Sequence, residues 1–278
     1  MNDSPIGVFD SGVGGLTVLK ALAAELPHER FVYLGDTARL PYGTKSPETV
    51  ARYALQAAEA LLEYGVKCLV IACNTASSVG LPAIRERIEG IPVVGVIEPG
   101  AEAACAASQS GHIAVIATEG TVRGGAYQEA ILRLRTGARI VALPTQLFVA
   151  LAEEGLHEGA IADNVARHYL DPLFSKGGGA SHPDTLVLGC THFPMLLGAI
   201  RGAVGPQIRI VDSAATTAKS VRQLLERLSL TRPADAADSL GEGATRFLAT
   251  DGPERFARIG SHFLQRAIRL EEVELVDL

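Results

Sequence analysis

Cysteine is scarce in this sequence, and no two cysteines lie close together in the chain. The protein has 278 residues and only four cysteines, and none of them forms a C-x-x-C motif. This pattern provides neither a disulfide framework nor the ligand spacing of a zinc site. We therefore expect free thiols in a reducing cytoplasm and no bound metal. The four residues are Cys68, Cys73, Cys105 and Cys190.

Long apolar runs and clusters of basic residues are also lacking. No uncharged apolar stretch reaches the roughly 18 residues that a membrane-spanning helix needs. The short polar start leads directly into a strand-like segment, so no signal peptide is expected. Lys and Arg number 25 against 31 Asp and Glu, which gives a formal net charge of −6. We expect a cytoplasmic protein that has neither a membrane nor nucleic acid as a partner.

Short apolar segments alternate with longer amphipathic ones along the chain. Hydrophobic residues make up 47% and charged residues 20%, enough to bury a sizeable core. The apolar segments are rich in Val, Ile and Leu without polar alternation, which is typical of parallel strands covered on both faces. Expected strands are 6–9, 31–35, 68–72, 93–96, 113–117, 140–143, 186–189, 208–211, 246–249 and 273–276. Expected helices include 13–26, 47–64 (capped by Ser46 and stopped by Gly65), 163–174 and one opened by Pro253; loops are expected at 176–182 and 231–243.

The chain contains an internal repeat. LVIACNT at 69–75 is similar to LVLGCTH at 186–192, so Cys73 and Cys190 stand at the same place in both copies. Chance similarity between buried strands is the alternative, but duplication of one α/β unit explains the match more naturally. We predict an α/β fold of two pseudo-symmetric, doubly wound parallel-sheet domains with the active site between them. The first would comprise residues 1–97 and 213–278, and the second residues 98–212.

Small polar residues and glycines follow several of the expected strands. Ligands of open parallel sheets bind beyond the carboxyl ends of the strands, where helix N-termini attract carboxylates or phosphates. Phosphate is the weaker choice, because both nucleotide-binding glycine motifs are absent and Asp10 would repel a pyrophosphate. The segments are Asp10-Ser11-Gly12, Gly35-Asp36-Thr37, Pro41-Tyr42-Gly43, Cys73-Asn74-Thr75, Thr118-Glu119-Gly120 and Cys190-Thr191-His192.

Cys73 and Cys190 form the most informative pair among these residues. A cysteine at a strand end is most often a small buried hydrophobic residue, as we expect of Cys68 and Cys105. If the two copies face each other, however, two thiols approach one bound molecule from opposite sides. Such a pair suits racemisation of an amino acid, in which one sulfur removes the α-proton and the other delivers a proton to the opposite face.

This chemistry requires a reactive thiolate and a stabilised carbanion. Helix N-termini after both cysteines, and a protonated His192 beside Cys190, would lower the thiol pKa from about 8.5. Asp10 is an anion and cannot do so; it could accept a proton, orient a thiol or hold the substrate ammonium. Candidate donors to the developing carbanion are Asn74, Thr75, Thr118, Thr121 and Thr191.

Several long segments resemble the signature segments of bacterial glutamate racemase. They are FDSGVGGLT at 9–17, GDTARLPYG at 35–43, ACNTAS at 72–77 and GCTHFP at 189–194, and the resemblance covers residues 5 to about 227. It implies cofactor-independent interconversion of L- and D-glutamate, which supplies D-glutamate for peptidoglycan. It also implies two α/β domains around the active site, in a homodimer.

The resemblance also assigns residue roles. It implies that Cys73 and Cys190 are the proton donor and acceptor pair. Asp10, Asp36, His192 and a carboxylate near the end of 147–155 are implied to assist; we choose Glu153 over its neighbour Glu154. The residues expected to bind substrate are Asp10, Ser11, Pro41, Tyr42, Gly43, Asn74, Thr75, Thr118, Thr121, Thr191 and His192.

Other functions and roles are open from the residues alone. An isomerase of the same superfamily could act on aspartate, a hydantoin or maleate, and a binding protein could take an acidic ligand without chemistry. Some members of the family are reported to bind DNA gyrase, which the acidic charge of this chain neither supports nor opposes. In purely structural roles, Asp10 would cap a helix, Tyr42-Gly43 would form a turn, and His192 would be a hydrogen-bonded histidine with no proton to move.

Overall fold

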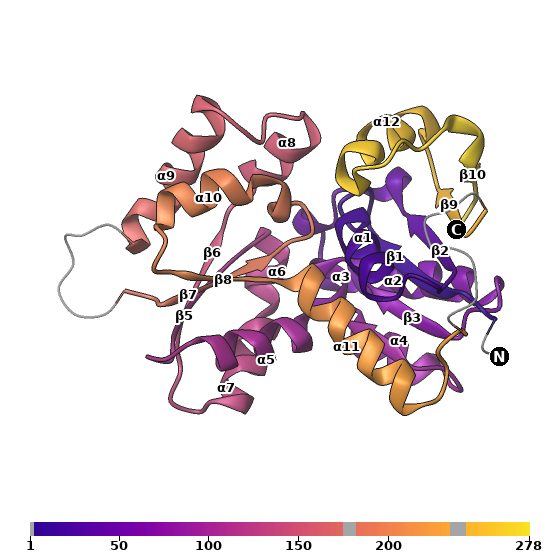
Figure 1. Cartoon of the computed structure of the whole chain (residues 1–278), viewed down its shortest axis with the longest axis horizontal. Helices are drawn as coiled ribbons and strands as arrows, with labels where there is room; N and C mark the ends of the chain where they lie inside the picture. Colours follow the sequence, from indigo (N-terminus) through magenta and orange to yellow (C-terminus); the bar gives the residue numbers. More distant parts are fainter. Residues whose placement is uncertain (1–2, 175–181, 234–242) are drawn as a thin grey trace.

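The computed structural model describes residues 3–174, 182–233 and 243–278. Its described strands form two sheets in which every pairing is parallel, with orders β10-β9-β2-β1-β3-β4 and β6-β5-β7-β8 (Figure 1). The predicted α/β fold built on parallel sheets is therefore confirmed. The strands are β1 (Ile6–Asp10), β2 (Phe31–Gly35), β3 (Cys68–Ile71), β4 (Val93–Gly95), β5 (His112–Ala117), β6 (Arg139–Pro144), β7 (Thr185–Gly189), β8 (Arg209–Asp212), β9 (Thr245–Ala249) and β10 (Val273–Leu275).

Helices pack on both faces of the larger sheet because successive side chains of a strand point to opposite faces. Ile6 and Val8 of β1 join one apolar cluster with α1, and Phe9 joins another with α2. The described α-helices are α1 (Leu16–Glu25), α2 (Pro47–Leu62), α3 (Asn74–Val79), α4 (Leu81–Arg87), α5 (Ile97–Ala107), α6 (Glu119–Gly124), α7 (Ala126–Leu134), α8 (Leu147–Glu153), α9 (Ala160–Phe174), α10 (Leu197–Val204), α11 (Ser213–Arg227) and α12 (Pro253–Leu264).

The internal repeat of the sequence corresponds to a repeat in strand order. The order β2-β1-β3-β4 in the larger sheet is the same as β6-β5-β7-β8 in the smaller one. Cys73 follows β3 and Cys190 follows β7, so the two cysteines leave equivalent strands. The strands β9 and β10, which lie beyond β2, are additions to one copy only.

The ends of two helices illustrate what local signals determine. Ser46 caps α2 as expected, because its Oγ accepts a hydrogen bond from the Thr49 amide at 3.3 Å. The prediction that the first helix begins at residue 13 is wrong: α1 begins at Leu16. Residues 11–15 instead form a glycine-rich turn, in which Gly12 N–H donates to Asp10 Oδ2 at 2.9 Å.

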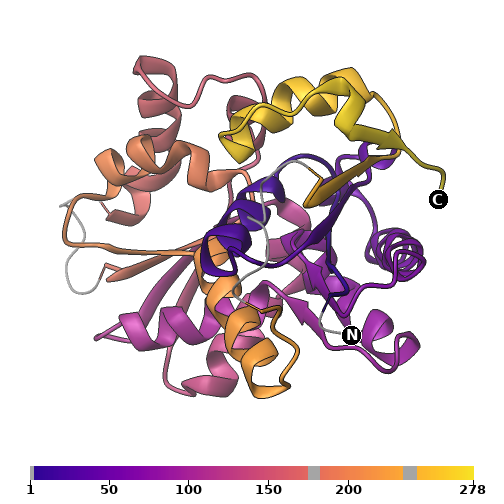
Figure 2. The same cartoon turned by 45° about the vertical axis from the view of Figure 1, so that its right-hand side comes forward.

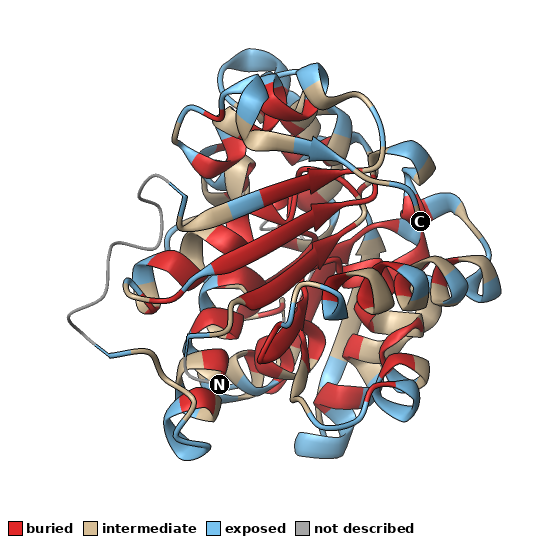
Figure 3. Ribbon diagram, turned by 90° about the vertical axis from the view of Figure 1, so that its right-hand side faces the viewer, coloured by how far each residue is buried: buried red, intermediate tan, exposed pale blue. Residues whose placement is uncertain are grey.

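One apolar cluster joins the two sheets. It contains Val8 of β1, Leu188 of β7 and Val221 of α11, the helix that lies beside both halves (Figure 2). Most of the strands are buried at the centre of the molecule, whereas β6, β10 and the outer helices are more exposed (Figure 3). The halves therefore share one core, which reaches the site at Cys190.

Two of the predicted features fall largely on residues outside the description. The loops expected at 176–182 and 231–243 lie for the most part beyond the described ranges. Among the helices that are described, none has both the length and the apolar character needed to cross a bilayer.

Candidate active site

A small cavity lies where the carboxyl ends of both sheets meet. Its volume is about 50 Å³, room for a few water molecules. Most of the predicted site residues line it, whereas Asp10, Asp36 and Thr121 do not. Leu40, Gln146 and Val149 also line it, although the sequence analysis did not predict them. The lining residues are Ser11, Gly12, Leu40, Pro41, Tyr42, Gly43, Cys73, Asn74, Thr75, Thr118, Gln146, Val149, Glu153, Cys190, Thr191 and His192.

Cys73 enters the cavity at the N-terminus of α3. Its Sγ accepts a hydrogen bond from the Ala76 amide at 3.5 Å and lies 3.6 Å from Ser11 Oγ. Burial, reinforced by the negative charge of Asp10, raises the pKa of the Cys73 thiol to about 12. The expectation that the helix N-terminus lowers this thiol's pKa is therefore wrong, because desolvation of the thiolate outweighs the amide contact. Cys73 is a neutral thiol in this structure.

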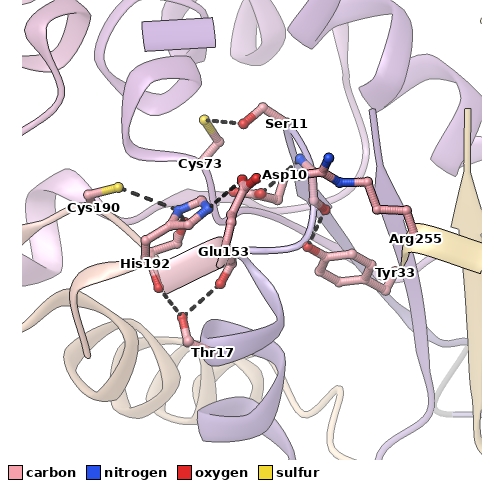
Figure 4. A network of polar contacts seen from close by, with 12 residues as sticks. Asp10, Ser11, Thr17, Tyr33, Cys73, Glu153, Cys190, His192 and Arg255 are labelled. Atoms are coloured by element: carbon pink, nitrogen blue, oxygen red, sulfur yellow. Dashed lines mark hydrogen bonds and ion pairs between the residues drawn. The ribbon is translucent and has the colours of Figure 1, made fainter. Parts of the chain in front are cut away.

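Cys190 enters the same cavity from the other half and lies beside a histidine. Its Sγ is 3.7 Å from His192 Nδ1, and His192 Nε2 is 3.1 Å from Glu153 Oε1 (Figure 4). Burial by itself would lower the pKa of His192, but its contacts with Cys190 and Glu153 prevail and raise that pKa to about 10. The two sulfurs thus have different surroundings, one without and one with a neighbouring cation.

Glu153, the carboxylate chosen from the sequence, contacts His192, whereas Glu154 is exposed. Burial favours the neutral acid, but the contacts of Glu153 with His192 and Arg255 outweigh it and lower the pKa of the carboxyl group below its ordinary value. Arg255 Nη2 donates to Glu153 Oε2 at 2.8 Å. No sequence signal pointed to Arg255, which is 102 positions away from Glu153.

Asp10 lies beneath the cavity, at the end of β1. Its Oδ2 accepts the Gly12 amide at 2.9 Å, and its buried Oδ1 has no hydrogen-bond partner among the described residues. Desolvation raises the pKa of this carboxyl group above its ordinary value, although His192 opposes the shift. The contact holds the turn and does not cap α1, whose N-cap residue Gly15 is followed by a helix that receives no side-chain cap. The helix-capping role considered for Asp10 is therefore wrong, and its assisting role stays a prediction.

Asp36 holds the Pro41-Tyr42-Gly43 segment in place. Its Oδ2 accepts hydrogen bonds from Arg39 Nε at 2.7 Å and from the Tyr42 hydroxyl, while its Oδ1 accepts from Thr250 Oγ1 at 3.0 Å. The side chain is completely buried and faces Tyr42 rather than the cavity. The contacts of Asp36 position Tyr42, which lines the cavity. A direct role of Asp36 in proton transfer stays a prediction.

Hydroxyl and amide groups link the two halves beside Cys73. The Thr75 Oγ1 of α3 lies 2.9 Å from Thr118 Oγ1 and 3.2 Å from Thr121 Oγ1, and the last two are 3.0 Å apart. Asn74 Oδ1 accepts from the Tyr127 hydroxyl at 2.8 Å, which leaves the buried Nδ2 without a partner in the described structure. Asn74 lines the cavity, so its amide nitrogen is an unused hydrogen-bond donor at the site.

The turn at residues 11–15 packs so closely on the Thr191-His192 turn that only glycine fits at position 14. A Cβ on Gly14 would lie 2.4 Å from both His192 Cε1 and Thr191 Oγ1. We expect G14A to lower the free energy of unfolding by about 1–3 kcal/mol, because it overpacks a buried contact. It should also displace His192 and reduce activity. Thermal unfolding compared with G137A, whose Cβ would meet nothing within 4 Å, tests this; equal stability of the two variants would contradict it.

The site contains two thiols, an imidazolium and an unpaired amide donor. Such a set is suited to proton transfer to and from a small carboxylic acid. Comparison with known proteins supports this interpretation of the site. The chain belongs to the Asp/Glu/Hydantoin racemase family, whose model matches residues 7–221, and it is an amino-acid racemase. Full-length relatives of the chain include curated glutamate racemases. The curated glutamate racemase of Geobacter metallireducens is 48% identical over 93% of this chain and 92% of its own length.

Solved structures extend the comparison to three dimensions. The glutamate racemase isoform RacE1 from Bacillus anthracis superposes with a TM-score of 0.91 at 34% identity, covering 100% of this chain and 99% of that one. The Francisella tularensis enzyme, solved in complex with D-glutamate, gives a TM-score of 0.88 at 34% identity and covers 100% of this chain and 98% of its own.

Proposed function

We propose that this protein interconverts L- and D-glutamate by a two-base 1,1-proton transfer between Cys73 and Cys190, without a cofactor. The observation that carries the proposal is that these two thiols, from equivalent strands of the repeat, open into one cavity. The substrate is inferred from full-length relatives named glutamate racemase and from the D-glutamate bound to the Francisella enzyme.

In the proposed reaction the Cys190 sulfur begins as a thiolate paired with the His192 imidazolium, and Cys73 begins as a thiol. For one enantiomer, the Cys190 thiolate takes the Cα proton and Cys73 delivers its own proton to the opposite face. This turnover leaves Cys73 as the thiolate and Cys190 as the thiol, and that form of the enzyme accepts the other enantiomer with the roles exchanged. Because L- and D-glutamate have equal free energy, a pair of bases of the same chemical type serves both directions.

The hydrogen-bond donors of the cavity are proposed to bind the substrate and stabilise the carbanion. The unpaired Asn74 Nδ2 and the hydroxyls of Thr75 and Thr118 lie at helix N-termini, where a carboxylate is favoured. Negative charge that develops on the α-carboxylate strengthens these contacts in the transition state. Ser11, Tyr42-Gly43 and Thr191-His192 complete the proposed binding set.

The domain division and the cellular role belong to the same proposal. Residues 1–97 with 213–278 would form one domain and residues 98–212 the other, and the two would separate to admit glutamate, because the cavity of about 50 Å³ is small for an amino acid. We propose a cytoplasmic homodimer that supplies D-glutamate for peptidoglycan.

Solvent isotope incorporation tests the proposed reaction. In D₂O, product formed from either enantiomer of glutamate should carry deuterium at Cα early in the reaction, while unreacted substrate keeps its protium. This difference arises because the sulfur that delivers the proton already carries deuterium from the solvent. The sulfur that removes the substrate proton holds protium, and any return of that proton restores unlabelled substrate. Parallel assays with aspartate and a hydantoin should show far slower turnover. Absence of exchange with all three would indicate a binding protein, and faster exchange with aspartate or a hydantoin would reassign the substrate.

A further inference from the structure

Arg255 makes a polar contact between the two halves of the molecule but does not line the cavity. It lies at the start of α12, directly after β9 of the larger sheet, and its Nη2 donates to Glu153 Oε2 at 2.8 Å. Glu153 ends α8 in the other half of the molecule. In Figure 4 the Arg255 side chain extends toward Glu153 on the side away from the two sulfurs.

The two oxygens of Glu153 have separate partners. Oε1 contacts His192 Nε2 at 3.1 Å, and Oε2 contacts Arg255. His192 in turn contacts the Cys190 sulfur through its other ring nitrogen, at 3.7 Å. The result is a continuous chain of contacts from Arg255 through Glu153 and His192 to Cys190.

The position of Glu153 explains why it needs an external cation. It is the last residue of α8, and a carboxylate at a helix C-terminus is repelled by the helix dipole. The last turn of α8 contains no basic residue, and the next residue is Glu154, a like charge. Since the Glu153 side chain is 19% exposed, it could also turn toward water. Arg255 is the cation that the structure supplies on the side opposite to His192.

We propose that Arg255 is a positioning residue that holds the Glu153 carboxylate against His192 and thereby keeps the imidazolium beside Cys190. The assignment of Cys190 as an acid/base rests on the function proposed above, whereas the contact of Arg255 with Glu153 and its effect on His192 do not. The charged or titratable groups that face His192 are Cys190, Glu153 and, more distantly, Asp10.

Titration of His192 tests the proposal independently of activity. In R255M, NMR should report a His192 pKa lower than in the wild type by about one unit, because a mobile Glu153 stabilises the imidazolium less. Loss of the Arg255 charge alone would act in the opposite direction, since a cation repels an imidazolium. A His192 pKa that rises or stays the same in R255M would therefore overturn the proposal.

Controls separate positioning from folding. R255K keeps a cation and should restore most of the shift, and R258M removes an exposed arginine of the same helix and should leave the His192 pKa unchanged. The double variant R255M/E153Q should titrate like E153Q alone, because Arg255 acts through Glu153. Additive effects of the two substitutions would contradict the assignment. Thermal unfolding of each variant verifies that it is folded at the temperature of the titration.

Kinetics then connect the positioning role to the reaction. R255M should lower kcat for glutamate racemisation by about tenfold while KM changes little, since Arg255 does not touch the cavity. A wild-type enzyme that does not racemise glutamate would defeat the proposed function but leave the His192 titration as a valid test of Arg255. A selective rise in KM would instead indicate that Arg255 binds substrate, which the proposal excludes.

Discussion

Replacement of either Cys73 or Cys190 with alanine should lower kcat for racemisation by at least about 10³-fold, because each variant lacks the acid/base group of one face. Both side chains are small and buried, so the loss of a sulfur should change the fold little. Initial rates in both directions, followed by circular dichroism or chiral chromatography, measure the effect.

The same variants should separate the two half-reactions. Each retains one sulfur, which can still remove and return the Cα proton of the enantiomer that presents its proton to that face. In D₂O, C73A and C190A should therefore exchange opposite enantiomers of glutamate, with little formation of the mirror image. C105A, which removes a partly exposed thiol outside the cavity, is the control and should behave as wild type. Wild-type-like racemisation by C73A or C190A would eliminate the two-base mechanism.

The second large effect is expected from His192. H192Q should lower kcat near neutral pH by about 10²-fold, because the Cys190 sulfur loses the cation that favours its thiolate. In the wild type, the contribution of the imidazolium should persist until the pH passes the His192 pKa of about 10. The pH–rate profile of H192Q should lack that basic limb. H168N, a change at an exposed histidine of α9, is the control; equal profiles for H192Q and wild type would contradict the role of His192.

The raised pKa of His192 also predicts how stability depends on pH. A histidine whose pKa is about 10 in the folded state and 6.5 in the unfolded state binds its proton more tightly when folded. Its stabilisation is complete below pH 6.5 and is lost as the pH rises toward 10. The melting temperature of wild type relative to H192Q should therefore be highest in mildly acidic solution and decline above neutrality.

Much of the fold could be predicted because its signals are local. The strand at Cys68 is a run of buried β-branched and aliphatic residues, and Ser46-Pro47 is a helix start that needs no distant partner. The similarity of 69–75 to 186–192 also predicted the equivalent positions of Cys73 and Cys190 in the two sheets. The first helix was misplaced at its start, because Val13 and Leu16 have the spacing of a helix whereas Gly14, between them, packs in a turn against Thr191 and His192.

The chemistry of the site was less accessible from the sequence. The helix N-terminus after Cys73 was expected to lower the thiol pKa, but the opposite shift follows from complete burial next to Asp10. The sequence named Glu153 as an assisting group and gave no indication of Arg255, its partner on another element. Desolvation and long-range contacts depend on what surrounds a group, and no spacing along the chain encodes them.

The sequence by itself determined the parallel strands, the repeat and the residue types that end each strand, because each follows from side-chain pattern over a few neighbouring positions. Only the tertiary structure decided that Cys73 stays a neutral thiol while Cys190 lies beside an imidazolium, and that Arg255 reaches Glu153. These properties arise when groups far apart in the chain are brought together, where desolvation and neighbouring charges determine the pKa of each group.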